Sequence, residues 1–161
     1  MNLLITRHDK IGDFVVTLPL LKAIKEQYPN TRLTALVSKI NFDFAKKIDF
    51  IDDVILFDKD NLTKTKKEIR SKKFDASISA YIDTDVGKLL FLSRIKKRVA
   101  PATKLAQLFF NKRVTQRRSQ VLKTEWQYNM DLALAIFPDL KLDFTKPLLE
   151  IDSQKEKRVV F

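Results

Sequence analysis

The chain has 161 residues, of which 45% are hydrophobic, and this length suits one domain with its own core better than two. It contains no cysteine and only one histidine, His8, which excludes disulfides and thiolate metal sites and argues against a histidine metal site. The net charge of +11 lies in one stretch, because residues 86–124 hold 11 basic residues and no acidic residue, whereas the remainder of the chain is balanced.

Apolar runs alternate with helical spacings along the whole chain, which predicts strands that alternate with helices. The expected order is strand 2–6, helix 14–28, strand 32–38, helix 42–48, strand 54–57, helix 61–73, strand 74–80, helix 84–95, strand 98–100, helix 104–110 and helix 124–137. Pro19 lies inside the first helical pattern and should kink that helix or delay its start. The alternation indicates an α/β fold, a Rossmann-like parallel sheet with helices on both faces.

The composition of the chain changes after residue 138. Residues 1–138 carry the strand and helix patterns, whereas residues 139–157 are polar and typical of a linker or a loosely packed extension. Residues 157–161 begin a further strand. We therefore expect that the end of the chain cuts into a following domain.

One segment carries a motif with chemical meaning, the turn between the first strand and the first helix. Gly12 should let the backbone turn tightly and approach a ligand, and Asp13 should lie at the start of the helix. Ligands of open α/β sheets bind beyond the carboxyl ends of the strands, where an ionised Asp13 could accept a proton from an attacking sugar hydroxyl. The alternative is that Asp13 only caps the helix. Neither a G-x-G-x-x-G motif nor a P-loop is present.

The motif R-x-x-x-x-G-D-x-x-x-x-x-P-x-L, together with two later segments, resembles glycosyltransferase family 9, the lipopolysaccharide heptosyltransferases. In this sequence the motif residues are Arg7, Gly12, Asp13, Pro19 and Leu21. Residues 108–113 (LFFNKR) resemble the family's L-[FL]-[YL]-N-R-R segment, and residues 125–134 lie where the family has a returning helix. The resemblance covers residues 1–137 in order.

The resemblance implies one half of a GT-B architecture. Residues 1–138 would be the amino-terminal acceptor-binding domain, and residues 139–161 would be a linker and the start of a missing carboxy-terminal donor-binding domain. The family transfers a heptose from ADP-heptose to the lipopolysaccharide inner core with inversion and without a metal, so we expect no cofactor other than the donor substrate. The fragment alone should have little or no transferase activity.

The resemblance also assigns site residues. Asp13 matches the family's catalytic base, and the residues that would line the acceptor site are His8, Asp9, Lys10, Ile11 and Gly12. The family's Asp-x-Gln-Gly after the fourth strand is absent here, where residues 79–82 read SAYI, and Asp83 and Asp85 lie nearby but out of register.

Further candidate binding residues come from the remaining basic and aromatic positions. Lys64 lies in a lysine-rich segment that could grip phosphates, although lysines on a helix face are more often solvated. Tyr81 ends a strand near the expected cleft and could stack on a sugar or simply pack. Lys112 and Arg113 follow the last expected sheet element and could face acceptor phosphates or an anionic inner leaflet.

The expected partners are therefore anionic. They are a phosphorylated lipopolysaccharide inner-core acceptor and the anionic surface of the inner membrane, with the basic stretch alternatively a solvated face without a partner. We expect no nucleic-acid partner, because the stretch has neither an RNA-recognition signature nor a helix-turn-helix pattern. No run of 18 apolar residues and no signal peptide is present, so we expect a cytoplasmic protein that can bind the membrane peripherally. The alternative function is a non-catalytic module that binds an anionic glycolipid or membrane; the oligomeric state stays open.

Overall fold

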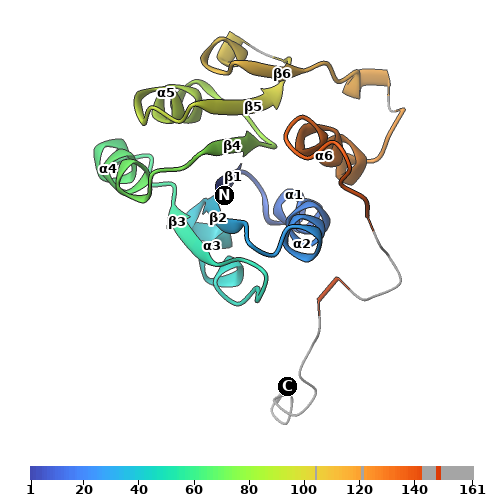
Figure 1. Cartoon of the computed structure of the whole chain (residues 1–161). Helices are drawn as coiled ribbons and strands as arrows, with labels where there is room; N and C mark the ends of the chain where they lie inside the picture. The colour runs from blue at the N-terminus through green and yellow to red at the C-terminus, as the bar shows by residue number, and fades with distance from the viewer. Residues whose placement is uncertain (104, 121, 143–147, 150–161) are drawn as a thin grey trace, which may run out of the picture.

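The computed structural model describes residues 1–103, 105–120, 122–142 and 148–149, and its centre is one parallel sheet of six strands. The strands are β1 (Asn2–Arg7), β2 (Arg32–Val37), β3 (Asp53–Leu56), β4 (Ala76–Ser79), β5 (Lys97–Pro101) and β6 (Lys112–Val114). Their order in the sheet is β3-β2-β1-β4-β5-β6, and every neighbouring pair is parallel (Figure 1). This is the strand order of a doubly wound Rossmann-type sheet, so the predicted fold class is confirmed.

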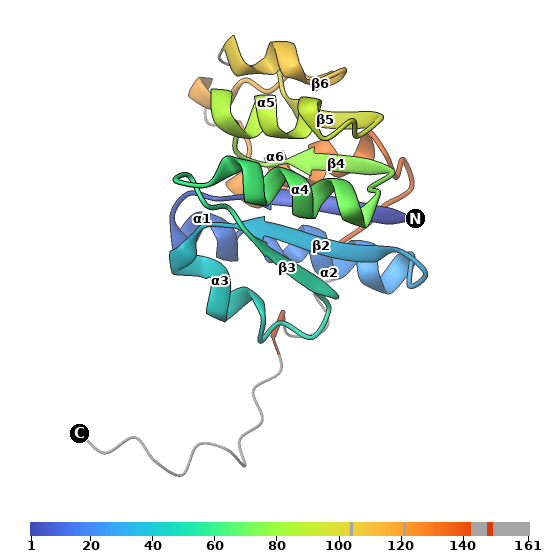
Figure 2. The ribbon, with the colours of Figure 1, turned by 90° about the vertical axis from the view of Figure 1, so that its left-hand side faces the viewer.

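Helices cover both faces of this sheet. The α-helices are α1 (Ile11–Val15), α2 (Leu18–Gln27), α3 (Lys39–Ala45), α4 (Leu62–Lys72), α5 (Thr84–Leu92) and α6 (Glu125–Leu134), with 3₁₀ helices η1 (Leu105–Phe109) and η2 (Arg118–Gln120). Figures 1 and 2 show α1, α2 and α6 on one face and α4, α5 and η1 on the other.

Alternate residues of the strands feed two separate cores, because successive side chains of a strand point to opposite faces. Leu3 and Ile5 of β1 pack with α1, α2 and α6, whereas Leu4 packs with Ile69 of α4 and Leu90 of α5. All five of these side chains are at most 1% exposed. The near-continuous apolar run of β1 therefore reflects burial on both faces of a parallel sheet.

Several predicted boundaries are wrong, each for a local reason. The helix expected over 14–28 is two helices, and α2 begins with Pro19 in its first turn, where a missing N–H costs nothing. The helix expected over 84–95 ends at Leu92, because Arg94 adopts a left-handed φ of 60° that turns the chain into β5. The segment expected to be an α-helix over 104–110 is the 3₁₀ helix η1 from Leu105 onward, and residue 104 lies outside the described residues.

Strand β6 was not expected at all, so Lys112 and Arg113 do not follow the last sheet element but form it. The late helix α6 ends at Leu134, three residues before its predicted end at residue 137. Helix α3 begins at Lys39, three residues before its predicted start at residue 42. The strand expected over 157–161 lies outside the described residues, as does most of the expected linker. None of the described helices has the length and hydrophobicity that a membrane crossing needs.

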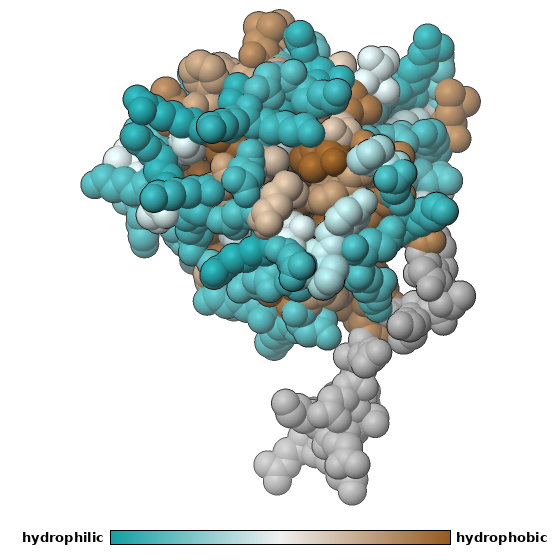
Figure 3. Space-filling view, viewed as in Figure 1, coloured by the Kyte–Doolittle hydropathy of each residue, from teal (hydrophilic) through white to brown (hydrophobic). Residues whose placement is uncertain are grey.

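The surface of the described residues is mostly hydrophilic. Ten large apolar side chains are nevertheless exposed: Met1, Ile11, Val15, Ile40, Phe91, Leu92, Leu105, Leu108, Leu122 and Leu134. In Figure 3 apolar atoms stand among hydrophilic ones at the top of the molecule, over η1.

Candidate active site

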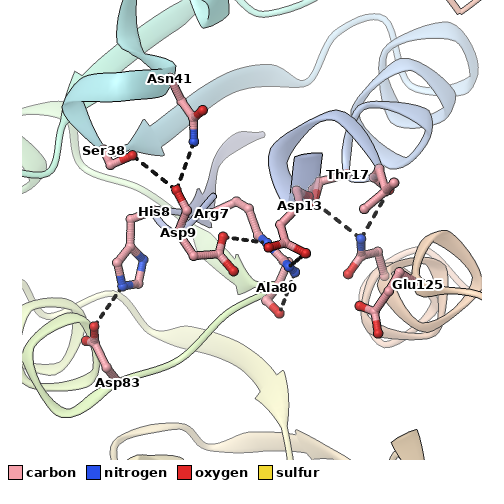
Figure 4. Close-up of polar contacts among 12 residues, drawn as sticks. Arg7, His8, Asp9, Asp13, Thr17, Ser38, Asn41, Ala80, Asp83 and Glu125 are labelled. Carbon is pink, nitrogen blue, oxygen red and sulfur yellow. Dashed lines mark hydrogen bonds and ion pairs between the residues drawn. The ribbon is translucent and has the colours of Figure 1, made fainter. Parts of the chain in front are cut away.

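The carboxyl end of β1 holds an arginine that binds two carboxylates. Arg7 is the last residue of the strand and is 3% exposed. Its Nε donates to Asp9 Oδ1 at 2.8 Å, and its second terminal nitrogen lies 3.0 Å from Asp13 Oδ1 (Figure 4). The remaining terminal nitrogen donates to the carbonyl of Ala80 at 3.1 Å, beyond the end of β4. One buried guanidinium therefore fixes the directions of both carboxylates relative to the sheet.

Asp13 itself is positioned by α1 and is open to solvent. It lies in the first turn of α1, and its side chain is 35% exposed. Lys10 is the N-cap residue, and no side chain caps this helix. The alternative that Asp13 caps its helix is therefore wrong. Among the described residues only Arg7 contacts the Asp13 carboxylate through an ion pair or hydrogen bond, which leaves the second oxygen available.

A second pair of polar side chains lies on the other side of the same strand end. His8 Nε2 lies 2.8 Å from Asp83 Oδ2, and the His8 side chain is 1% exposed. Asp83 is also the N-cap of α5, where it accepts the backbone N–H of Val86 at 2.8 Å. His8 Nδ1 is buried and has no hydrogen-bond partner among the described residues. The pair therefore ties the β1 loop to the start of α5.

The electrostatics of Asp83 follow from these contacts. Burial is the largest single effect and would raise its pKa, but the hydrogen bonds from His8 and Val86 and the charges of His8 and Lys59 together lower the pKa of Asp83 to about 2. Asp83 is therefore a structural anion across the physiological pH range rather than a proton carrier.

Two further elements hold the loop that carries these residues. The carbonyl of Asp9 accepts from Ser38 Oγ and from Asn41 Nδ2, both at 3.3 Å. On the other side, Asn129 of α6 donates to the carbonyl of Val16 at 3.2 Å and contacts Thr17 Oγ1 at 3.3 Å. Helix α6, far along the chain, thus packs against the α1–α2 junction (Figure 4).

Arg118 brings a positive charge to the same region. Its guanidinium forms an ion pair with Glu125 Oε2 at 2.8 Å and lies 5.3 Å from the Tyr128 ring centroid. Among the described residues no other acidic side chain forms an ion pair with it. One terminal nitrogen is buried without a hydrogen-bond partner among the described residues. Burial lowers the pKa of Arg118, and Arg7 and Asp13 are close enough to act on it electrostatically.

The structure brings together most of the acceptor residues predicted from the sequence. Lys10, Ile11 and Gly12, which precede Asp13 in the chain, are exposed, and Asp9 is half-buried. Tyr81 is half-buried, and its ring centroid lies 5.1 Å from that of His8 in an edge-on contact. These residues surround the carboxyl end of β1.

Three predicted residues lie away from this group. Lys64 is exposed in the first turn of α4, on the opposite face of the sheet from α1 and α6. Lys112 and Arg113 are exposed on β6, three strands away from β1, which is on the order of 14 Å at the usual strand spacing. The described contacts do not connect any of the three to Asp13.

The role expected for Gly12 is corrected. The described glycines have no positive φ, and a Cβ at Gly12 would have no atom within 4 Å. The turn itself therefore does not require glycine. The open space in front of Gly12 is where a ligand could approach the backbone.

Two residues of this region have no predicted role. Arg7 belongs to the motif without a function of its own, and Asp83 lies out of register with the family's Asp-x-Gln-Gly. A charged residue directly after a buried strand is a usable signal for Arg7, since such a position points into the site. The contact between Asp83 and His8 joins residues 75 positions apart and leaves no local signal.

No protein-family model matches the chain. A Haemophilus influenzae protein described as "Putative glycosyltransferase" is 38% identical over 150 residues, which covers 91% of this chain and 43% of that protein. The chain therefore spans less than half the length of this curated relative.

Solved structures share the fold at low identity. The crystal structure of the glycosyl transferase family 9 from Veillonella parvula matches with a TM-score of 0.74 and 17% identity, over 84% of this chain and 40% of that one. E. coli heptosyltransferase WaaC with ADP matches with a TM-score of 0.69 and 18% identity, over 91% and 50% of the two chains. E. coli ADP-heptose lps heptosyltransferase II matches with a TM-score of 0.65 and 13% identity, over 74% and 36%. The resemblance read from the sequence is thus confirmed: this chain is similar in sequence to a glycosyltransferase relative and has the fold of about half of a family 9 heptosyltransferase.

Proposed function

We propose that the chain is the acceptor-binding half of an inverting, heptosyltransferase-like glycosyltransferase. Its acceptor would be a phosphorylated lipopolysaccharide inner core, and its donor ADP-heptose would bind to a domain outside this chain, without a metal or other cofactor. The observation that supports this most is the Arg7–Asp13 ion pair of 3.0 Å, which orients a partly exposed carboxylate at the sheet edge where α/β folds bind ligands.

The proposed mechanism gives Asp13 the role of general base. Inversion requires the acceptor hydroxyl to attack the anomeric carbon on the face opposite the departing ADP, and the hydroxyl loses its proton as the bond forms. The free oxygen of Asp13 accepts that proton, while Arg7 holds the other oxygen in place. A positioned base of this kind typically contributes about 10²- to 10⁴-fold to the rate.

Cations near Asp13 support an anionic acceptor. Lys10 is exposed directly before α1, and Arg118 has a buried nitrogen without a partner among the described residues. A Cβ at Gly12 would have no atom within 4 Å, so the backbone next to Asp13 is open to a ligand. A phosphate of the acceptor would pair with Lys10, whereas Arg118 already pairs with Glu125.

Binding measurements with the chain itself test this proposal. Titration calorimetry with the heptose-free, phosphorylated inner-core oligosaccharide should give saturable binding, and ADP-heptose should give none. Lys10→Met should weaken acceptor binding about tenfold, which corresponds to one lost charge-assisted contact. Lys47→Met is the matched control, because Lys47 is exposed beyond the end of α3 and should leave the affinity unchanged. Binding of ADP-heptose without binding of the oligosaccharide would overturn the proposal.

A further inference from the structure

The face of the molecule that carries α4, α5 and η1 contains a basic hollow that the proposed function does not use. This hollow has a volume of about 540 Å³ and lies where the ends of α4 and α5 meet the start of β5. Its cations are Lys66, Arg70, Arg94, Lys96 and Arg98, and no acidic residue lines it. Figure 2 looks onto this face, on which α4, α5 and η1 lie side by side.

Most of these cations have no partner in the part of the chain that the structure describes. Among residues 1–103, 105–120, 122–142 and 148–149, no ion pair or hydrogen bond engages the side chains of Lys66, Arg70, Arg94 or Lys96. Arg98 is the exception, because it donates to the carbonyl of Phe109 at 2.8 Å and its guanidinium lies 5.3 Å from the Phe91 ring centroid. Uncompensated cations around a hollow favour an anionic partner.

A second, smaller hollow extends this region between the two helices. It has a volume of about 230 Å³, shares Lys66 and Leu92 with the first, and adds Lys88. Asp85 is the one acidic residue that lines it. The two hollows together therefore present six cations and one carboxylate.

Exposed apolar side chains adjoin the cations on the same face. Phe91 and Leu92 at the end of α5 are 52% and 53% exposed, and Leu105 and Leu108 of η1 are 85% and 73% exposed. Helix α5 and η1 pack directly on each other, with the rings of Phe91 and Phe109 6.2 Å apart between centroids. The four exposed side chains therefore belong to two elements in direct contact.

We infer that this face, formed by α4, α5 and η1, docks on an anionic phospholipid bilayer. The cations would hold headgroup phosphates, and Phe91, Leu92, Leu105 and Leu108 would enter the interfacial layer of the lipid. Surface proteins without a spanning helix bind membranes by this combination of basic attraction and shallow apolar insertion. A nucleic acid would bind the cations but would offer no apolar surface to the exposed leucines. A bilayer offers both phosphates and an apolar layer, so it suits this face better.

Lys112 and Arg113, the pair expected from the sequence to meet the membrane, lie on the edge strand β6 and do not line either hollow. The inference goes beyond the proposed transferase function and does not depend on it, since the hollow lies on the opposite face of the sheet from α1 and α6. Docking through this face would leave the Asp13 edge of the sheet unobstructed.

Vesicle flotation with the chain tests the inference. The chain should bind vesicles of phosphatidylcholine with about 30 mol% phosphatidylglycerol, should not bind pure phosphatidylcholine vesicles, and should lose most binding at about 0.5 M NaCl. The charge variant Arg70→Gln, Arg94→Asn, Lys96→Gln should weaken the partition coefficient about tenfold or more, since each cation near the lipid contributes.

An apolar variant and two controls make the test specific. The apolar variant Leu105→Ser, Leu108→Ser should also weaken binding about tenfold. Its control is Ile40→Ser, which removes an apolar side chain that is 68% exposed outside this face and should leave binding unchanged. The charge control is Lys39→Gln, Lys47→Gln, Lys141→Gln, which removes the same charge from exposed positions outside the face.

Each contrary outcome overturns the inference. Absence of binding to anionic vesicles, or equal losses in the control sets, would contradict this face as the docking surface. Binding to a single-stranded RNA that depends on the three cations, with vesicle binding unaffected by both variants, would identify a nucleic-acid surface instead. Binding of the soluble inner-core oligosaccharide should be unchanged in both face variants, which separates failure of this inference from failure of the proposed function.

Discussion

The carboxyl edge of the sheet and the α4–α5–η1 face both concentrate charge, but they do so in opposite ways. At the carboxyl edge Arg7 binds Asp9 and Asp13, and His8 binds Asp83, so charges of both signs are buried or half-buried and paired. On the other face cations such as Arg70 and Lys96 are exposed and pair with no described residue.

The difference shows what each region is built for. Buried, paired charges hold side chains in one geometry, which a catalytic group needs, because leaving one member unpaired is costly. Exposed, uncompensated cations hold no geometry of their own, and they stabilise a complex only when an anionic surface arrives. We therefore expect the carboxyl edge to determine the stability and chemistry of the chain. We expect the α4–α5–η1 face to determine its association with a membrane.

The largest expected effect comes from breaking a buried pair at the edge. Arg7→Met leaves Asp9 and Asp13 without their cation and should lower the free energy of unfolding by about 3–5 kcal/mol in urea titrations. The matched change on the face, Arg70→Met, should cost less than about 1 kcal/mol, because Arg70 is exposed. Equal costs for the two substitutions would contradict the comparison.

A smaller loss of stability should come from Gly87, which lies where α5 packs against η1. A Cβ at Gly87 would lie 2.7 Å from Phe109 Cδ2, so Gly87→Ala should lower the free energy of unfolding by about 1–3 kcal/mol as α5 and η1 separate. Urea titrations measure this loss. An unchanged free energy of unfolding would contradict the prediction, because it would mean that the Phe109 ring moves aside without cost.

The response to acid should be smaller still. Because the folded pKa of Asp83 is lowered to about 2 from 3.8, this carboxylate stabilises the fold above about pH 4, and the contribution is lost as the pH falls through about 2. We expect about 1–2 kcal/mol from this one group after allowance for solvent screening. Urea titrations of wild type and Asp83→Asn across this range should converge at the acid end, whereas Asp85→Asn, an exposed control, should follow wild type throughout.

The smallest effect should be a gain. Gly12→Ala meets no atom within 4 Å and lies in α1, so it should stabilise the fold by about 0.5–1 kcal/mol. If the backbone at Gly12 is a contact for the acceptor, the same variant should bind the inner-core oligosaccharide several-fold more weakly. A variant that is both more stable and equally able to bind would remove Gly12 from the acceptor site.

The sequence predicted the parts of this molecule that depend on local pattern. Five of the six strands follow from apolar runs, and Pro19 correctly marks a helix start. Strand β6 was missed because Lys112–Val114 offers one apolar residue, and its pairing with β5 comes from tertiary contact. The motif predicts that Asp13 lies at the start of the first helix. It does not predict the ion pair with Arg7, which depends on the direction of the Arg7 side chain at the end of β1.

Long-range pairs account for what the sequence could not supply at the site. His8 and Asp83 are 75 positions apart, and Asn129 and Val16 are 113 apart. The first contact forms only once the carboxyl ends of β1 and β4 meet at one edge of the sheet, and the second only once α6 packs against the α1–α2 junction. The composition of residues 86–124 shows the excess of positive charge. It does not show that some of these cations line the same hollow as exposed Leu92.

The most direct test of the central claim is turnover in a protein that joins this chain to a donor-binding half. Asp13→Asn should lower kcat by about 10²- to 10⁴-fold while the affinity for the acceptor stays within a few-fold of wild type, because the proposed role is proton transfer. Asp9→Asn, which alters the other carboxylate on Arg7, should keep most of the rate. Turnover by Asp13→Asn within a few-fold of wild type would contradict the account.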